Sequence, residues 1–250
     1  MTGDTSPAPG ACRGGRRAAP AGRTLAQVSD RLPLFPLGLV LLPGLMLPLH
    51  VFEERYRVLV RDLLELPEEQ QRFGVVAIRE GREVGADGVT ALHEVGCVAQ
   101  LRRVEPYEDG RYDLVTTGAD RFRLTGLDTG GPYLVGEVEW LPDDMGPAQE
   151  APLLDSAVRA ALLDYLAALG QASGEDVELP QLPSSSLVLG YLVAATVLLD
   201  LDDRQALLDA VDGATRLRAE LSVLRREGTL LRVLRDAPSP ELARGPISLN

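Results

Sequence analysis

The chain has 250 residues, 45% of them hydrophobic, so it is long enough for one or two buried cores. All 25 basic residues are arginine, and the absence of lysine excludes a P-loop, a Schiff-base enzyme and a Ser–Lys catalytic pair. The net charge of −12 argues against a broad nucleic-acid-binding surface, because contacts to phosphate need positive charge.

The first 31 residues are rich in Gly, Ala, Pro and Arg and carry almost no large apolar side chains, which predicts a disordered tail over residues 1–31. Arg16 and Arg17 resemble the start of a twin-arginine export signal, but no continuous apolar segment follows them. We therefore expect a cytoplasmic protein. Cys12 lies in this tail and Cys97 in a predicted strand, so no structural disulfide is expected.

The stretch Leu32–Phe52 contains no charged residue and is long enough to resemble a membrane span. Four prolines and two glycines interrupt it and would break a membrane helix, so no membrane segment is expected. The prolines instead separate two predicted strands, Leu39–Leu42 and Leu47–Phe52. Apolar residues at helical spacing then predict a helix over residues 56–64 that ends before Pro67.

The middle of the chain alternates apolar and polar residues between turn signals, which predicts an antiparallel sheet with one solvated face. Hairpin turns are expected at Glu108–Gly110 and Gly118–Asp120. Successive hairpins at this spacing favour a β-barrel over residues 32–142. The predicted strands are Phe73–Arg79, Glu94–Val104, Arg111–Thr117, Arg121–Gly126 and Tyr133–Leu141.

The apolar period changes to that of helices beyond a polar linker at Pro142–Ala151. This change predicts a helical bundle over residues 152–236 and a tail over residues 237–250. The first helix of the bundle starts near Leu154 and is expected to end at Gly170, because glycine commonly ends helices.

Three further helices are predicted in the bundle. Leu187–Leu199 is apolar on nearly all sides and too short to span a bilayer, so it is expected to be the central buried helix. Ser184–Ser186 can cap it, and Asp202 or Asp203 is expected to cap the next helix. The last helix, Ala214–Leu234, carries leucines on one stripe, which would mediate self-association if the bundle left it uncovered.

Three segments carry a resemblance to a known family. They are LPLFPLGLVLLPGLMLPLHVFEERYRVLV from Leu32, EVGCVAQLRRVEPYEDGRYDLVTTGADRFRL from Glu94, and DDRQALLDAVDGATRLRAELSVLRRE from Asp202. Together they resemble the substrate-binding domain of Lon-type ATP-dependent proteases, and more closely the standalone bacterial proteins that consist of that domain. The resemblance implies an α+β fold, with a PUA-like antiparallel β-barrel followed by a C-terminal α-helical bundle. It also implies a module that engages polypeptides or partner proteins.

Candidate catalytic chemistry is sparse. His93 and Glu94 begin like a zinc-protease motif, but Cys97 stands where the second histidine belongs, and the chain has one other histidine, His50. We therefore expect no metal site, no cofactor and no catalytic residue, and we predict that the chain is not an enzyme. His50 lies in a predicted strand, where packing or hydrogen bonding is expected rather than catalysis.

A candidate polypeptide-binding surface lies around the turn that precedes the second predicted strand. Its residues are Phe35, Leu37, Leu45, Met46 and Leu47. They are apolar, and methionine adapts to varied partners at binding surfaces. Either all five pack into the core, which we favour, or some remain exposed and bind unfolded polypeptide or a protein partner.

Three functional hypotheses follow. We predict a non-catalytic module that recognises unfolded polypeptide or a protein partner. The alternative is a small-molecule-binding protein or hydrolase that uses a groove between barrel and bundle. An RNA-binding module is the third hypothesis and needs a basic patch at Arg102, Arg103, Arg121 and Arg123. Arginines at alternating strand positions are instead expected to be solvated, so nucleic acid is not the expected partner.

Overall fold

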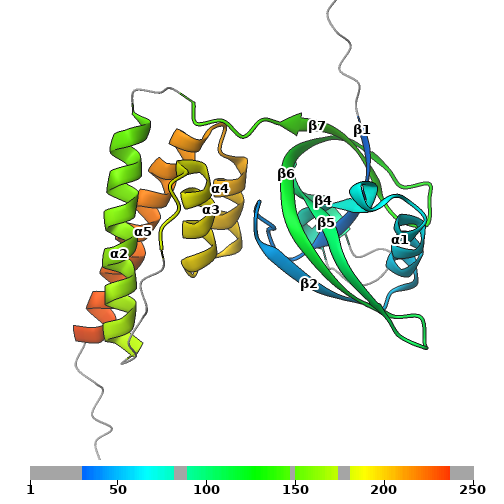
Figure 1. Cartoon of the computed structure of the whole chain (residues 1–250), viewed down its shortest axis with the longest axis horizontal. Helices are drawn as coiled ribbons and strands as arrows, with labels where there is room; N and C mark the ends of the chain where they lie inside the picture. The colour runs from blue at the N-terminus through cyan, green and yellow to red at the C-terminus, as the bar shows by residue number, and fades with distance from the viewer. Residues whose placement is uncertain (1–29, 82–88, 147–149, 174–180, 237–250) are drawn as a thin grey trace, which may run out of the picture.

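The computed structural model describes residues 30–81, 89–146, 150–173 and 181–236. Figure 1 shows two parts side by side: a curled sheet with one helix, and a group of helices. The segment that follows the last strand joins them.

Seven strands and five α-helices occur in the described ranges. The strands are β1 (Asp30–Leu37), β2 (Met46–Val51), β3 (Arg72–Gly81), β4 (Val89–Leu92), β5 (Val95–Pro106), β6 (Tyr112–Asp128) and β7 (Val135–Leu141). The helices are α1 (Glu54–Leu64), α2 (Ala151–Ser173), α3 (Ser186–Thr196), α4 (Leu201–Asp209) and α5 (Gly213–Asp236), with a short 3₁₀ helix at Glu68–Gln70. Within those ranges, no helix has the length and apolar character needed to cross a membrane.

The sheet begins earlier than predicted. Asp30 and Arg31 belong to β1, where they pair with Val138 and Glu137 of β7. The predicted disordered tail is therefore wrong for these two residues, because a strand distant in sequence supplies their partners. The other residues of both predicted tails lie outside the described ranges.

The strands form one sheet in the order β1-β7-β6-β5-β3-β4, with β2 added beside β6. Neighbouring strands are antiparallel, as predicted, except that β1 and β3 pair in parallel. Because β1 pairs with both β7 and β3, the hydrogen-bonded order returns on itself through five strands. The curled shape of the sheet in Figure 1 reflects this return.

The uncharged N-terminal stretch folds as a strand, a loop and a second strand. The strand predicted at Leu47–Phe52 is confirmed as β2, whereas Leu39–Leu42 is a largely buried loop and not a strand. The carbonyl of Leu42 lies so close to Gly118 of β6 that a side chain there would collide with it. Gly44 then turns the chain with a φ of +81°, which favours glycine. The conformation of the loop therefore depends on a close approach of two backbones. Hydrophobic periodicity does not indicate such a contact.

The central strands bury both of their faces. Val75 and Cys97 face a core that also contains α1, whereas Val76 and Val98 face a second apolar cluster around Phe122. All buried members of the second cluster come from strands. The expected solvated face is therefore wrong for this part of the sheet, because the sheet curls and its own strands cover that face.

The helical part follows the predicted order with two shifts. α2 continues through Gly170 to Ser173, so that glycine does not end the helix. Asp200 caps α4, since its Oδ1 accepts a hydrogen bond of 2.7 Å from the N–H of Asp203. The predicted cap at Asp202 or Asp203 is therefore wrong, and both residues lie in the first turn of the helix. The predicted serine cap of α3 is confirmed at Ser185.

The leucine stripe of the last helix is covered by the chain's own bundle. Leu217 and Leu224 of α5 are buried in a cluster with α2 and α3, and Leu221 and Leu231 pack against that cluster. The predicted stripe is therefore not a free apolar face. Self-association through Ala214–Leu234 stays a prediction.

Arg121 of β6 is buried and joins the sheet to the helices. Its Nη1 donates hydrogen bonds of 2.7 Å to the carbonyls of Leu208 and Ala210, and 2% of the residue is exposed. These carbonyls lie at the end of α4, where the helix dipole favours a cation. The expectation that Arg121 is solvated is wrong, because α4 comes from a distant part of the sequence. Arg102 and Arg123 are exposed, as predicted.

A second buried arginine also contacts α4 and the segment between sheet and helices. Arg216 of α5 donates from Nε to the carbonyl of Leu207 at 3.1 Å and pairs with Asp143 at 3.3 Å. Its guanidinium lies over the ring of Tyr191, 4.2 Å from the centroid. The hydroxyl of Tyr191 donates to Asp143 at 2.8 Å, and burial raises the pKa of this tyrosine above its usual value. The segment between sheet and helices is thereby held at Asp143.

Glu220 of α5 is fully buried one helical turn from Arg216. Its two carboxylate oxygens have no hydrogen-bond partner in the described residues, and a Cβ at Gly190 of α3 would lie 2.9 Å from Oε1. Burial raises the pKa of Glu220 from 4.5 to about 7, although Arg216 offsets part of this effect. The folded state therefore binds this proton more tightly than the unfolded state does, so the stability it contributes falls as pH rises from about 4.5 to about 7.

We predict that Glu220→Gln stabilises the protein increasingly as pH rises. The free energy of unfolding, measured by urea titration, should exceed that of the wild type by about 3 kcal/mol at pH 8, because each pKa unit is worth about 1.4 kcal/mol. The gain should be much smaller at pH 4.5. Glu69→Gln, at an exposed position, serves as the control and should show no such dependence. An equal gain for Glu220→Gln at both pH values would contradict the prediction.

Candidate functional site

The structure separates the five predicted binding residues into buried and exposed ones. Phe35, Leu37 and Leu47 are buried in the core with α1. Leu45 is partly buried and packs against the same core. Met46 is the exposed member, with 76% of its surface accessible. The turn is thus mostly core, and Met46 alone of the five presents a large apolar surface to a partner.

A groove lies between β2 and the end of β1. Its cavity has a volume of about 250 Å³. Phe35 and Leu37 form part of its wall, so two predicted residues contribute to a concave surface although they are buried. Leu39 of the buried loop and Phe52, at the end of β2, complete its apolar lining. We call this cavity the β1–β2 groove.

Phe52 is a residue of this groove that sequence reasoning did not select. It is 51% exposed and stacks near His50, with 6.3 Å between ring centroids. Its position at the end of the uncharged stretch, directly before Glu53, was the available signal. Met46 and Phe52 thus place exposed apolar side chains at the two ends of β2.

A polar cluster lies on the other side of β2. Nδ1 of His50 and the hydroxyl of Tyr107 each lie 2.6 Å from the carboxylate of Asp113. The hydrogen bonds from Tyr107 and His50 lower the pKa of Asp113. Arg111 lies 3.3 Å from the remaining ring nitrogen of His50. The expected hydrogen-bonding role of His50 is thus observed, and the cluster ties the hairpin between β5 and β6 to β2.

A second hollow adjoins this cluster on the outer face of β2, β5 and β6. Its volume is about 470 Å³, and it shares Pro48, Leu49 and His50 with the β1–β2 groove. Arg103 and Glu105 line it and form an ion pair with each other. Strand β2 therefore has a concave surface on each side of its second half.

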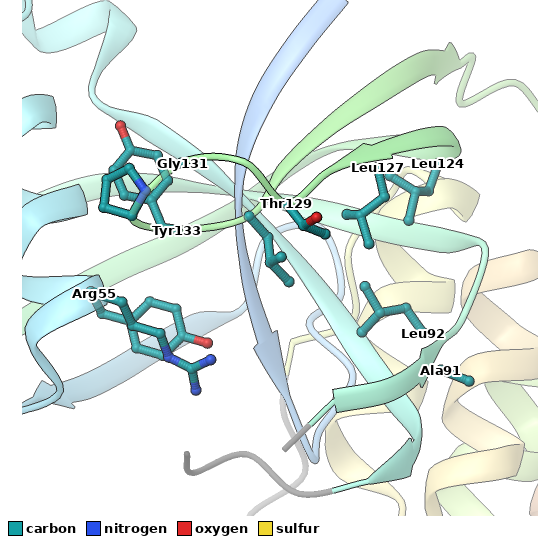
Figure 2. A pocket seen from close by; sticks show the side chains of 11 residues that line it. Arg55, Ala91, Leu92, Leu124, Leu127, Thr129, Gly131 and Tyr133 are labelled. Atoms are coloured by element: carbon teal, nitrogen blue, oxygen red, sulfur yellow. The ribbon is translucent and has the colours of Figure 1, made fainter. Parts of the chain in front are cut away.

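A larger cavity of about 540 Å³ lies between α1, β4 and the connection from β6 to β7. Figure 2 shows Arg55 and Tyr133 on one side of it and Leu92, Leu124 and Leu127 on the other. The volume is in the range of small-molecule sites. Its lining is mainly apolar, which favours binding over acid–base chemistry.

Tyr133 supplies a polar group to this cavity in its neutral form. Its hydroxyl donates a hydrogen bond of 2.8 Å to Asp62, and burial together with this bond raises the pKa of Tyr133 to about 12. All three cavities are lined by residues before Pro142. The expected groove between barrel and bundle is not among them.

Metal-ligand chemistry finds no support in the geometry. Across the part of the chain that the structure describes, no three His, Cys, Asp or Glu side chains gather as a metal site would require. Cys97 is fully buried, and burial raises the pKa of its thiol, which disfavours the thiolate that binds metals.

Two solved structures share this arrangement of sheet and helices. The Lon N-terminal domain protein from Xanthomonas campestris is 29% identical, with a TM-score of 0.55, and the alignment covers 77% of this chain and 98% of that one. The N-terminal domain of the Mycobacterium avium complex Lon protease has a TM-score of 0.57 at 17% identity, over 78% of this chain and 98% of that one, which supports the fold alone. The fold is therefore that of Lon N-terminal domains.

The sequence comparison agrees. The family model for the substrate-binding domain of the ATP-dependent protease La (Lon) matches residues 31–226. The chain belongs to this family. It is 28% identical to Lon protease 2 of Myxococcus xanthus over 81% of the chain, and 31% identical to the Lon protease of Paraburkholderia phytofirmans over 86%. These alignments cover 24% and 27% of the two proteases, so the chain spans about a quarter of their length.

Substitutions at the turn should have different effects on stability at the buried Leu47 and at the exposed Met46. Leu47→Ala should lower the free energy of unfolding by about 3 kcal/mol, because it leaves a cavity in the core. Met46→Ala should change it by less than about 0.5 kcal/mol, because Met46 is exposed. Urea unfolding of both variants measures the difference. Similar losses for the two variants would contradict the placement of Met46 at the surface.

Proposed function

We propose that this chain is a non-catalytic recognition module that binds unfolded polypeptide through the surface along β2. The observation that carries the proposal is the family match over residues 31–226, which falls on a substrate-binding domain and not on the ATPase or peptidase parts of Lon. The β1–β2 groove supports the choice of surface, since it combines an apolar lining with exposed Met46 and Phe52 at the ends of the strand. Exposed apolar side chains beside a concave surface are typical of binding sites.

We also infer that the strands that close on themselves form the PUA-like barrel implied by the resemblance. The pairing of β1 with both β7 and β3 supports this interpretation. RNA-binding members of that fold do not change the proposal. Arg121 is buried and Arg103 pairs with Glu105, so two of the four arginines of the predicted basic patch are not available to phosphate.

A small-molecule-binding function is the second candidate, and the cavity in Figure 2 favours it. A ligand there would contact Leu124, Leu127 and Tyr133, and the cavity shares Tyr56 with the lining of the β1–β2 groove. Met46 and Phe52 do not line this cavity, so substitutions at these two residues test the two functions separately. A cytoplasmic location stays a prediction.

The proposal predicts saturable binding of an unfolded polypeptide. Fluorescence anisotropy of labelled, reduced and carboxymethylated lysozyme should rise as the full chain is added, and native lysozyme should not compete. A double variant, Met46→Asp with Phe52→Asp, should weaken binding about tenfold, because it places charges on the apolar surface. Circular dichroism would verify that the variant is folded.

The matched control places the same two charges on the helical part. Leu153→Asp with Leu198→Asp alters side chains that are 77% and 80% exposed, and it should leave binding unchanged. Equal weakening by both double variants would exclude the β2 surface. No binding of the unfolded polypeptide at high micromolar concentration would overturn the proposed function.

A further inference from the structure

Strand β2 has one paired edge and one free edge among the described strands. It pairs with β6 alone. The carbonyl of Leu45 accepts a hydrogen bond of 2.8 Å from the N–H of Gly118, and the carbonyl of Leu47 accepts one of 2.9 Å from the hydroxyl of Thr116. Successive residues of a strand turn their backbone N–H and C=O groups to opposite sides. Since Leu45 and Leu47 face β6, the backbone groups of Met46, Pro48 and His50 point away from it.

The free edge presents a short row of donors and acceptors. Met46 and His50 contribute an N–H and a C=O each, whereas Pro48 contributes a C=O only. Proline in a strand is confined to edges of this kind. It also interrupts the row of donors, which discourages continuous pairing of two copies of the same strand.

The β1–β2 groove lies along this edge. Its lining includes Pro48 to Phe52 on one side and Phe35 to Leu37 on the other. The cavity of about 250 Å³ between them is lined mainly by apolar residues, with His50 and Glu53 also in its wall. A chain lying beside β2 would therefore have polar partners for its backbone and an apolar cavity for one large side chain.

We infer that the groove binds an extended polypeptide segment by strand addition to β2, with one apolar side chain inserted between β1 and β2. This inference rests on the proposed function and names the conformation of the bound segment. The partial charges of the free N–H and C=O groups are complementary to the edge of another extended chain. A helix is a poor occupant, because its own hydrogen bonds already satisfy its backbone.

The inference restricts which segments bind. Side chains of a strand alternate between two faces, so the inserted apolar residue is flanked by neighbours that point away from the cavity. Backbone pairing is independent of sequence, so many unfolded polypeptides share the binding mode. Specificity then comes from the inserted side chain and from contacts with Met46 and Phe52.

The first test uses the peptide backbone. Overlapping peptides of about ten residues from the lysozyme sequence, long enough to run past β2, would locate a binding segment. N-methylation of its amides, one at a time, removes single donors. Methylation should weaken binding about tenfold at alternate positions and much less at the positions between them, because one edge of the peptide faces β2. A uniform or random pattern would overturn strand addition.

The second test uses the protein backbone. His50→Pro removes a groove-facing N–H, and His50→Ala removes the same side chain but keeps that donor. Binding should be about tenfold weaker for the proline variant than for the alanine variant, with both folded by circular dichroism. Equal affinity of the two variants would overturn strand addition.

The outcomes distinguish this inference from the proposed function. Binding of unfolded lysozyme without alternation along the peptide, or without a difference between the His50 variants, leaves the proposed function standing and overturns strand addition. Failure of unfolded lysozyme and all its peptides to bind overturns both.

Discussion

The sheet part of this protein depends on the burial of the uncharged segment Leu32–Phe52. Its prolines prevent it from forming a helix. Its leucines enter a core shared by the sheet and α1, so the segment cannot stay in solvent. The close approach of Leu42 to Gly118 places the following strand beside β6. Strand β2 then has one partner, and a groove remains between it and β1. The same constraint thus builds the core and leaves the proposed binding surface open.

The attachment of the helices depends on buried charge. Arg121 and Arg216 place their guanidinium groups at the last carbonyls of α4, where both the unpaired acceptors and the helix dipole favour a cation. Asp143 on the connecting segment and Tyr191 of α3 complete the arrangement. Each of these buried cations needs acceptors nearby, because an unpaired buried charge is strongly destabilising. Glu220 lacks hydrogen-bond partners in the described residues, so its charge opposes the fold as pH rises.

The two parts of the molecule make different contributions. The three cavities are all lined by the sheet part, whereas buried Arg121 hydrogen-bonds from the sheet to the end of α4. In Figure 1, α3 and α4 lie between the sheet and the outer pair α2 and α5. The helices therefore support the sheet from one side. The β1–β2 groove and the cavity of Figure 2 offer two places for a ligand, and Tyr56 lines both.

The sequence alone determined the class of the fold, the order of sheet and helices, and the family resemblance, because periodicity and local motifs are properties of neighbouring residues. It also selected the turn before β2, which adjoins the surface proposed here for binding. It could not decide that Leu47 is core and Met46 surface, that Arg121 is buried, or that Leu39–Leu42 is a loop. Each of these depends on a partner far along the chain: the core around α1, the end of α4, and Gly118 of β6. Only the tertiary structure brings such partners together. Contacts through backbone groups, such as the carbonyls of α4 and the backbone at Gly118, do not depend on side-chain type and so leave no periodic pattern in the sequence.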